Sequence, residues 1–254
     1  MAKLGLQLFT VKDEADRDLY GTLSKISEMG YEGVEFSAGI MKKTPAGKLK
    51  SYLDKIDLKL IGLILLNDEL ETQMDGILRY CKDCGCRNVI FPWIPEEFRT
   101  EEGYRSFACK MNDWGRIFQS RGIRFLYHIH GYEFEKLGTK NGMDILLENT
   151  DPRDVNLEID VYWVEWGGVD SVTFMEKYGD RSPMIHFKDM KDKKTMHDVE
   201  VGAGVIDMKA IAVIGKRNNA EWFIVEQEKF DMPTLDSAKI SLMNLRAISD
   251  AFED

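Results

Sequence analysis

Short apolar runs alternate with longer amphipathic stretches along the whole chain, with a repeat of about 30 residues, the length of one strand-helix unit. The short runs predict eight buried strands: Lys3–Phe9, Gly33–Phe36, Lys59–Leu65, Asn88–Phe91, Arg124–His130, Asn156–Ile159, Met184–Phe187 and Trp222–Val225. The amphipathic stretches predict eight helices: Leu19–Met29, Pro45–Ile56, Leu70–Cys84, Glu101–Arg121, Met143–Asn149, Ser171–Tyr178, Met208–Lys216 and Leu235–Phe252.

The connections between these elements repeat the same turn chemistry. Gly30, Gly85 and Gly122 each stand where a helix would end in a left-handed cap, and a predicted strand follows within a few residues. Strict alternation of strands and helices implies parallel strands joined by right-handed crossovers. Eight such units in 254 residues, with no Pro- or Ser-rich linker, favour a single (β/α)8 barrel domain over residues 1–254 rather than an open sheet.

Charge and hydropathy narrow the class of partner. The chain carries 34 basic and 44 acidic residues, a net charge of −10, and a field of this sign repels nucleic acid and anionic lipid. We find neither an apolar window long enough to span a bilayer nor a secretory signal. The sequence therefore predicts a cytoplasmic protein with no nucleic-acid or membrane partner.

The four cysteines fit reduced cytoplasmic thiols better than a disulfide framework. Cys81, Cys84 and Cys86 are closely spaced, as zinc ligands can be, but a structural zinc site needs four ligands and only the isolated Cys109 remains. We therefore interpret the cluster as a helix end followed by a turn.

Histidine gives the first indication of chemistry, because the active face of such a barrel lies at the C-terminal ends of its strands. His128 and His130 close the fifth predicted strand and His186 closes the seventh, which leaves only His197 in a loop. Residues two apart in a strand point the same way, so His128 and His130 should share a face. A lone histidine at such a position is more often a packed core residue, but three histidines at strand ends favour a functional site.

Carboxylates occupy equivalent positions on other strands. Asp160 follows the sixth strand, Glu226 follows the eighth, and Glu35 lies within the second. Mixed histidine and carboxylate sets bind divalent ions such as Mn, Zn, Fe or Co, whereas burying these carboxylates without a cation would be costly. The sequence thus predicts a divalent metal site at the barrel mouth.

Several segments resemble the sugar phosphate isomerase/epimerase family, the xylose isomerase-like TIM barrels. The resemblance spans nearly the whole chain, and it is carried by Leu4–Val11, Gly30–Phe36, Tyr127–Phe134, Leu157–Trp163, His186–Met190, Asp198–Asp207 and Ile224–Gln227. These motifs are specific for the superfamily and uninformative about the substrate, since its members include ketose epimerases, hydroxypyruvate isomerases, inosose dehydratases and enzymes acting on 3-keto-glycosides.

The resemblance implies metal ligands residue by residue. The family's metal-binding Asp, His and Glu on strands six, seven and eight match Asp160, His186 and Glu226. The strand-five ligand is a glutamate in the ketose epimerases, whereas His128 stands at the matching position here, with Glu133 as the alternative. The implied cofactor is a divalent ion, with Mn preferred over Co, Zn or Mg.

The resemblance also implies a reaction, the transfer of a proton α to the carbonyl of a keto-sugar or related polyol. The metal would polarise the carbonyl, while Glu226 or a histidine takes the proton. We expect four catalytic residues and three substrate-binding residues. The catalytic set is Glu226, His128, His130 and Lys188, and the substrate-binding set is Gln7, Glu35 and Trp163.

Two of these roles have structural alternatives. Lys188 could hold a hydroxyl or an oxyanion, or it could pair with an acid such as Glu158. His130 could contact substrate or serve only in packing. The replacement of the strand-five glutamate by His128 removes the symmetric carboxylate pair of two-base epimerases, so isomerisation, elimination and dehydration all fit.

Three functions therefore stay open: a metal-dependent sugar isomerase or epimerase, a lyase, dehydratase or hydrolase acting on inososes or 3-keto-glycosides, and an inactive barrel that binds a sugar or a protein. A fourth function, an endonuclease IV-type phosphodiesterase, is disfavoured, because it needs more histidines than four and a surface that tolerates DNA, whereas this chain has a net charge of −10. The partner we expect is a small carbohydrate, with a neutral keto-sugar favoured over a phosphorylated one. Barrels of this family often associate, so a homo-oligomer is compatible with the sequence.

Overall fold

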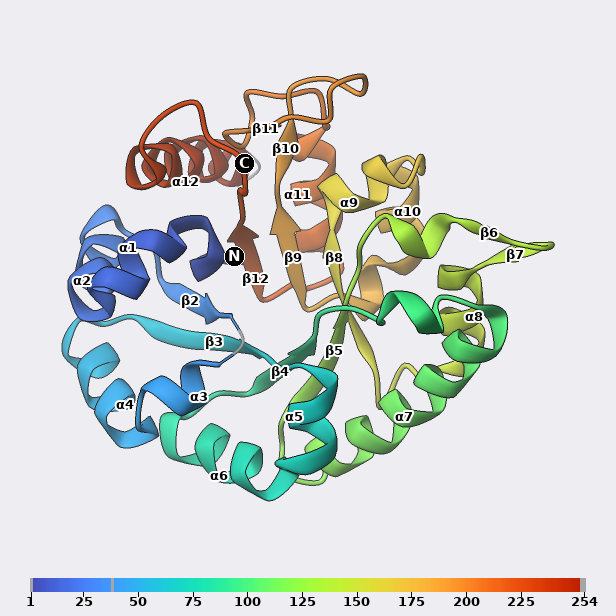
Figure 1. Ribbon diagram of the computed structural model, residues 1–254. Helices are drawn as coiled ribbons and strands as arrows, with labels where there is room; N and C mark the ends of the chain where they lie inside the picture. The colour runs from blue at the N-terminus through green and yellow to red at the C-terminus, as the bar shows by residue number, and fades with distance from the viewer. Residues whose placement is uncertain (1, 38, 252–254) are drawn as a thin grey trace.

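Eight parallel strands close into a barrel in the computed structural model, which describes residues 2–37 and 39–251 (Figure 1). The strands pair in the closed order β1-β12-β9-β8-β5-β4-β3-β2. Their bounds are β1 Lys3–Gln7, β2 Gly33–Phe36, β3 Lys59–Ile64, β4 Asn88–Phe91, β5 Arg124–His128, β8 Asn156–Asp160, β9 Met184–Phe187 and β12 Trp222–Val225. The predicted (β/α)8 barrel is confirmed.

Helices surround the strands on the outside of the barrel (Figure 1). The main helices are α2 Leu19–Met29, α4 Ala46–Lys55, α6 Met74–Cys84, α7 Glu101–Gln119, α8 Gly142–Asn149, α10 Ser171–Tyr178, α11 Met208–Arg217 and α12 Thr234–Asp250. Shorter helices stand mostly in the loops after strands: α1 Lys12–Arg17, α3 Ile40–Lys43, α5 Asn67–Thr72 and α9 Val161–Trp166, with the 3-10 turns η1 Leu8–Val11, η2 Glu96–Phe98, η3 Tyr132–Phe134 and η4 Gly179–Arg181. Two small antiparallel hairpins complete the fold, β6 Lys136–Leu137 with β7 Lys140–Asn141 and β10 Asp189–Met190 with β11 Asp198–Val199.

The core has two parts, as expected of a barrel wrapped in helices. The larger apolar cluster fills the space between strands and helices. A smaller one lies inside the barrel, comes from β3, β4, β5, β9 and β12, and consists of Ile61, Ile90, Leu126, Met184, Trp222 and Ile224. All residues of β2, β4, β9 and β12 are buried, which explains why their sequences lack polar alternation.

The predicted caps are confirmed. Gly30, Gly85 and Gly122 have φ values of 101°, 76° and 71°, the left-handed region that glycine adopts without strain. At the other end of a helix, Asp207 caps the start of α11, where its side chain accepts a hydrogen bond from the Ala210 N–H. The helix α6 ends at Cys84, so the cysteine cluster is a helix end and turn. Within the described residues, no group of metal-ligating side chains includes a cysteine.

Several predicted boundaries differ from the observed ones. The first strand ends at Gln7 rather than Phe9, because η1 begins at Leu8. The fifth strand ends at His128 rather than His130, because the chain turns into η3 and the His130 N–H binds a side chain instead of a neighbouring strand. The helix predicted over Leu70–Cys84 is two helices that meet at Gln73. The predicted end of the last helix at Phe252 lies outside the described residues. Within residues 2–37 and 39–251, no helix is both long and apolar enough to cross a membrane.

Candidate active site

Four side chains meet at the C-terminal end of the barrel, one from each of four adjacent strands. His128 is the last residue of β5, Asp160 is the last of β8, His186 lies in β9, and Glu226 directly follows β12. One ligand atom from each can be chosen so that all four lie within 4.8 Å of one another, and all four residues are buried. The structure thus brings together the four side chains that the sequence predicts as metal ligands.

The strand register explains this convergence. Asp160 is the direct neighbour of His186 in the β8–β9 pair, and Ile224, two residues before Glu226, is the neighbour of His186 in the β12–β9 pair. Side chains two apart on a strand point to the same side. Parallel strands in this register therefore direct Asp160, His186 and Glu226 into one space.

Contacts within the cluster are short. His186 Nδ1 lies 2.6 Å from Glu226 Oε2 and 3.9 Å from Asp160 Oδ2. Asp160 Oδ1 accepts hydrogen bonds from the N–H groups of Tyr162 and Trp163, at the start of α9, whereas its buried Oδ2 has no hydrogen-bond partner within residues 2–37 and 39–251. One carboxylate oxygen is therefore fixed by a helix N-terminus and the other is left for a cation.

The protonation states reflect a crowded, buried set of acids. Burial raises the pKa of Asp160 to about 8. Burial alone would lower the pKa of His186, but the carboxylates of Glu158 and Glu35 outweigh it and raise that pKa well above the ordinary value. For Glu226, burial opposes ionisation, yet Lys188 and His186 hold its pKa below the ordinary value. A divalent cation fits this donor set of imidazole nitrogens and carboxylate oxygens, because it would offset the buried negative charge.

A second layer of carboxylates lies beneath the four residues. Glu158 and Glu35 are fully buried, and their oxygens lie 3.4 Å and 3.3 Å from His186 Nε2. Glu158 Oε2 also lies 2.9 Å from His128 Nδ1. Burial, followed by the neighbouring Glu158, raises the pKa of Glu35 to about 8. The structure thus places Glu35, which the sequence predicts to bind substrate, behind His186.

Lys188 stands beside the cluster, directly after β9. Its Nζ lies 2.6 Å from Glu228 Oε1, 4.0 Å from Glu226 Oε1 and 4.8 Å from the ring of Trp163. The carboxylate nearest to it is Glu228, not Glu158, which the sequence suggested as its alternative partner. Burial opposes its charge, but Glu226 and Asp160 outweigh burial and raise the pKa of Lys188. The side chain is therefore a buried, permanently charged ammonium at the edge of the cluster.

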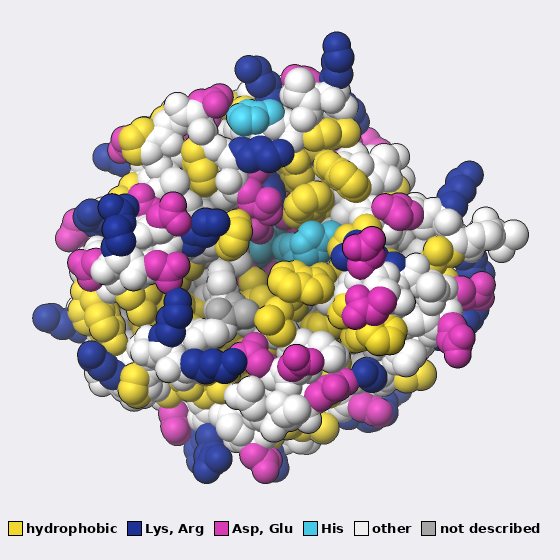
Figure 2. Space-filling model, viewed as in Figure 1, with side chains coloured by type: hydrophobic (Ala, Val, Ile, Leu, Met, Phe, Trp, Pro, Cys, Tyr) yellow, Lys and Arg dark blue, Asp and Glu magenta, His cyan; other side chains and the backbone are white. Residues whose placement is uncertain are grey.

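Aromatic rings form one side of the site. The His130 ring centroid lies 4.8 Å from that of His128 and 5.2 Å from that of Trp163, so the two histidines share a face as predicted. His130 Nδ1 and Trp163 Nε1 are buried and have no hydrogen-bond partner in the part of the chain that the structure describes. Burial and His128 lower the pKa of His130, which keeps this imidazole neutral. Figure 2 shows histidine at the centre of the face, bordered by hydrophobic and acidic side chains.

Two other predicted residues serve local structure. Glu133 accepts hydrogen bonds from the Tyr127 hydroxyl and from the His130 N–H (3.1 Å), so its carboxylate fixes the turn after β5 and stays outside the cluster. The structure thus places His128, and not the alternative Glu133, with the other three residues. Gln7 Oε1 accepts a 2.5 Å hydrogen bond from the Phe9 N–H and so caps η1.

Sequence reasoning missed the acids that surround the cluster. Glu158, Asp198 and Glu228 all contact residues of the site, and Asp198 Oδ2 accepts hydrogen bonds from the N–H groups of Glu228 and Lys229. The signal was present for two of them, since Glu158 and Glu228 each lie two residues from a predicted ligand and so point to the same side. Asp198 lies in a hairpin, and its role depends on tertiary contacts.

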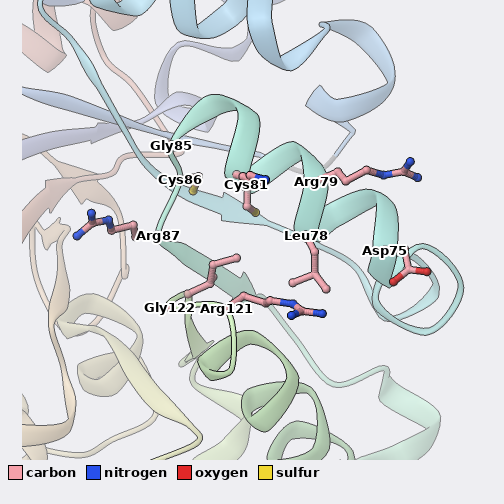
Figure 3. Close-up of a pocket in the computed structure, with 11 residues that line it drawn as sticks. Asp75, Leu78, Arg79, Cys81, Gly85, Cys86, Arg87, Arg121 and Gly122 are labelled. Carbon is pink, nitrogen blue, oxygen red and sulfur yellow. The ribbon is translucent and has the colours of Figure 1, made fainter.

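A concavity lies at the opposite end of the barrel. It has a volume of about 1020 Å³ between α6 and the turn after α7, and Arg79, Arg87 and Arg121 are among its lining residues (Figure 3). These residues precede strands β4 and β5, at the N-terminal face of the barrel. Because barrel enzymes place their active sites at the C-terminal face, we assign the candidate site to the four-residue cluster.

Comparisons with known proteins identify relatives and structural neighbours of this chain. An "Inosose dehydratase" of Geobacillus kaustophilus is 29% identical over 199 residues, which are 70% of this chain and 62% of that protein, so the chain spans less than two thirds of this relative. The solved structure of a sugar phosphate isomerase/epimerase from Parabacteroides distasonis superposes with a TM-score of 0.82 at 22% identity, over 97% of this chain and 94% of that one. The IOLI protein, solved with a bound zinc atom, superposes with a TM-score of 0.77 at 15% identity, over 98% and 99% of the two chains.

The family model of the xylose isomerase-like TIM barrels matches residues 23–248. This range includes β2 to β12 and all four residues of the cluster. The chain therefore belongs to the xylose isomerase-like TIM barrel family.

Proposed function

We propose that this protein is a metal-dependent dehydratase that removes a proton next to the carbonyl of a cyclic polyol ketone or related keto-sugar and expels water from the neighbouring carbon. The observation that carries the proposal is the convergence of His128, Asp160, His186 and Glu226 on one buried point. These residues would hold the metal. When bound, a divalent ion supplies positive charge that polarises the substrate carbonyl.

Glu226 is the proposed base. Its pKa is held below the ordinary value, so it is ionised, and Lys188 Nζ lies 4.0 Å from its Oε1. Proton abstraction breaks the C–H bond next to the carbonyl and leaves negative charge on the carbonyl oxygen. The ammonium of Lys188 is placed to stabilise that charge.

The strand-five position, where the two-base epimerases have a second carboxylate, carries His128. At the strand-five position, burial and His186 lower the pKa of His128 to about 3, and its Nδ1 is engaged by Glu158. A two-base epimerase needs proton transfer on both faces of the substrate. We therefore favour chemistry in which only one face exchanges its proton, namely dehydration or isomerisation over epimerisation.

His130 supports dehydration in particular. Its neutral imidazole lies next to His128 and Trp163, and its buried Nδ1 has no hydrogen-bond partner among the described residues. A neutral imidazole is a weak acid, so His130 is placed to hydrogen-bond the departing hydroxyl while the proton taken by Glu226 passes to that oxygen. The C–O bond then breaks, a C=C bond forms and water leaves. The flat ring of Trp163 provides a stacking surface for a substrate ring.

The inosose dehydratase relative supports the same reaction class. Isomerisation, which the sequence predicted first, remains the second candidate because it shares the proton abstraction by Glu226 and differs only in where the proton returns.

The test is incubation of the metal-loaded protein with an inosose, a 3-keto-glycoside and a ketohexose in deuterated water, followed by NMR and mass spectrometry. Loss of one water from the inosose identifies the dehydratase, and an isomeric product labelled at one carbon identifies the isomerase. Absence of both exchange and product with all three, by a protein shown to contain metal, would contradict proton-transfer chemistry on these classes.

A further inference from the structure

Glu158 occupies a position that the proposed reaction does not use. It lies in β8 between the strands that carry the two candidate histidine ligands, β5 and β9. It is the direct register neighbour of His128 in the β5–β8 pair, and it lies two residues before Asp160 on the same side of the strand. Its side chain therefore points into the barrel, one layer below the proposed ligands.

A single oxygen of this carboxylate contacts both imidazoles. Glu158 Oε2 forms a 2.9 Å hydrogen bond with His128 Nδ1 and lies 3.4 Å from His186 Nε2, an ion-pair contact without hydrogen-bond geometry. The other nitrogen of His186, Nδ1, faces Glu226 and Asp160. Each imidazole thus turns one nitrogen towards Glu158, and its second nitrogen is the one left for the metal.

We propose that Glu158 is a positioning residue that fixes the tautomer and orientation of both histidine ligands through one carboxylate oxygen. This inference rests on the proposed function, since it assumes that His128 and His186 bind a metal. When a histidine binds a metal through one nitrogen, a carboxylate next to the other nitrogen holds the proton there and increases the basicity of the nitrogen that binds the metal. Here one acceptor serves two ligands, so its loss disturbs two of four metal bonds.

Glu35 provides an internal comparison. Its Oε1 lies 3.3 Å from His186 Nε2, and neither of its oxygens has a hydrogen-bond partner in the described residues. It approaches the same nitrogen of His186 as Glu158 does, but within the described residues it forms neither a hydrogen bond nor an ion pair with His128. Loss of Glu35, which acts on one ligand, should therefore lower the metal affinity less than loss of Glu158, which acts on two.

The experiment measures metal affinity of the apoprotein by competition with a chromophoric chelator, using Zn²⁺, in wild type, Glu158→Gln, Glu35→Gln and Glu165→Gln. Glu165 is the matched control, a buried glutamate whose Oε1 accepts hydrogen bonds from the N–H and hydroxyl of Ser171. We expect affinity to fall roughly 10- to 100-fold in Glu158→Gln, by less in Glu35→Gln, and to stay at the wild-type value in Glu165→Gln.

Thermal unfolding with and without Zn²⁺ separates positioning from a structural role. A positioning role predicts that Glu158→Gln loses most of the stabilisation by Zn²⁺. If Glu158→Gln is destabilised equally in both forms and keeps wild-type affinity, the inference is overturned. Binding of two ions per wild-type chain, with one lost in Glu158→Gln, would also overturn it, because Glu158 would then be a ligand.

Imidazole NMR of the wild-type protein provides a test that needs no variant. The chain has only four histidines, and zinc is diamagnetic, so their tautomers can be assigned from nitrogen chemical shifts. We expect the Zn²⁺ form to carry protons on His128 Nδ1 and His186 Nε2, and the opposite tautomer at either residue would contradict the inference. A wild type that binds no metal would instead refute the proposed function.

Discussion

Glu226 and His186 lie side by side at the barrel mouth, with Glu226 Oε2 2.6 Å from His186 Nδ1. The contact joins the residue proposed as base to a proposed metal ligand on the adjacent strand. In a metal-free protein the protonated imidazole supplies positive charge to the surrounding carboxylates, which is the role that a divalent ion would take over.

Replacing Glu226 by Gln should abolish the reaction. The amide keeps the shape of the side chain but cannot take a proton, so we expect substrate exchange in deuterated water to fall by at least about 100-fold. Metal affinity should fall as well, because a neutral oxygen replaces an anionic ligand. Proton exchange at the wild-type rate in Glu226→Gln would show that another group is the base.

The fourth ligand can be identified with two variants. His128→Ala should weaken Zn²⁺ binding, because it removes one of the four donors. Glu133→Gln should leave Zn²⁺ affinity unchanged, since that carboxylate is occupied by the Tyr127 hydroxyl and the His130 N–H. Isothermal titration calorimetry of the two apoproteins measures their Zn²⁺ affinities. If Glu133→Gln weakened Zn²⁺ binding and His128→Ala did not, the strand-five ligand would be Glu133.

Metal binding should release a proton and strengthen as pH rises. The pKa of His186 lies well above its ordinary value because the effect of Glu158 and Glu35 outweighs burial, so the apoprotein holds a proton on Nδ1 near neutral pH. A metal must displace that proton. Apparent Zn²⁺ affinity should therefore increase up to about tenfold per pH unit at pH values below that pKa. If the affinity did not change between about pH 6 and 8, around the usual histidine pKa, the result would contradict this protonation state.

Glu133 should make the protein less stable as pH rises. Burial raises its pKa to about 7 from the ordinary value of 4.5, so the folded state holds more protons than the unfolded state between these pH values. Its contribution to stability is complete below about pH 4.5 and is lost as pH rises through about 7, with an upper limit of roughly 3 kcal/mol. Urea unfolding of Glu133→Gln at several pH values should show a weaker decline than wild type, and an identical decline would refute the assignment.

Much of this fold could be predicted because its strands are buried on both faces. Four strands, including Gly33–Phe36 and Met184–Phe187, have the bounds predicted from apolar runs and glycine caps. The boundary after β5 could not be predicted in this way, because it depends on the Glu133 side chain binding the His130 N–H. The apolar pattern continues through Ile129 even though the strand has ended.

The meeting of the four candidate ligands could also be predicted, since three of them follow from strand ends and the family resemblance. The position of Glu158 behind both histidines and the partner of Lys188 could not, because they depend on strand register and on loops that meet only in the folded chain. The sequence shows that Glu158 and Asp160 share a face, but not that His128 is the neighbour of Glu158. Likewise, the contact between Lys188 and Glu228 requires two loops to come together.

The most direct test of the central claim is the metal content of the purified protein, measured by mass spectrometry after loading with Mn²⁺, Co²⁺ or Zn²⁺ and removal of free ions. We predict one divalent ion per chain in wild type, and loss of that ion in Asp160→Asn and His186→Ala, while Glu165→Gln retains it. A folded wild type that holds none of the three metals would contradict the account and favour a barrel that binds a sugar or a protein without catalysis.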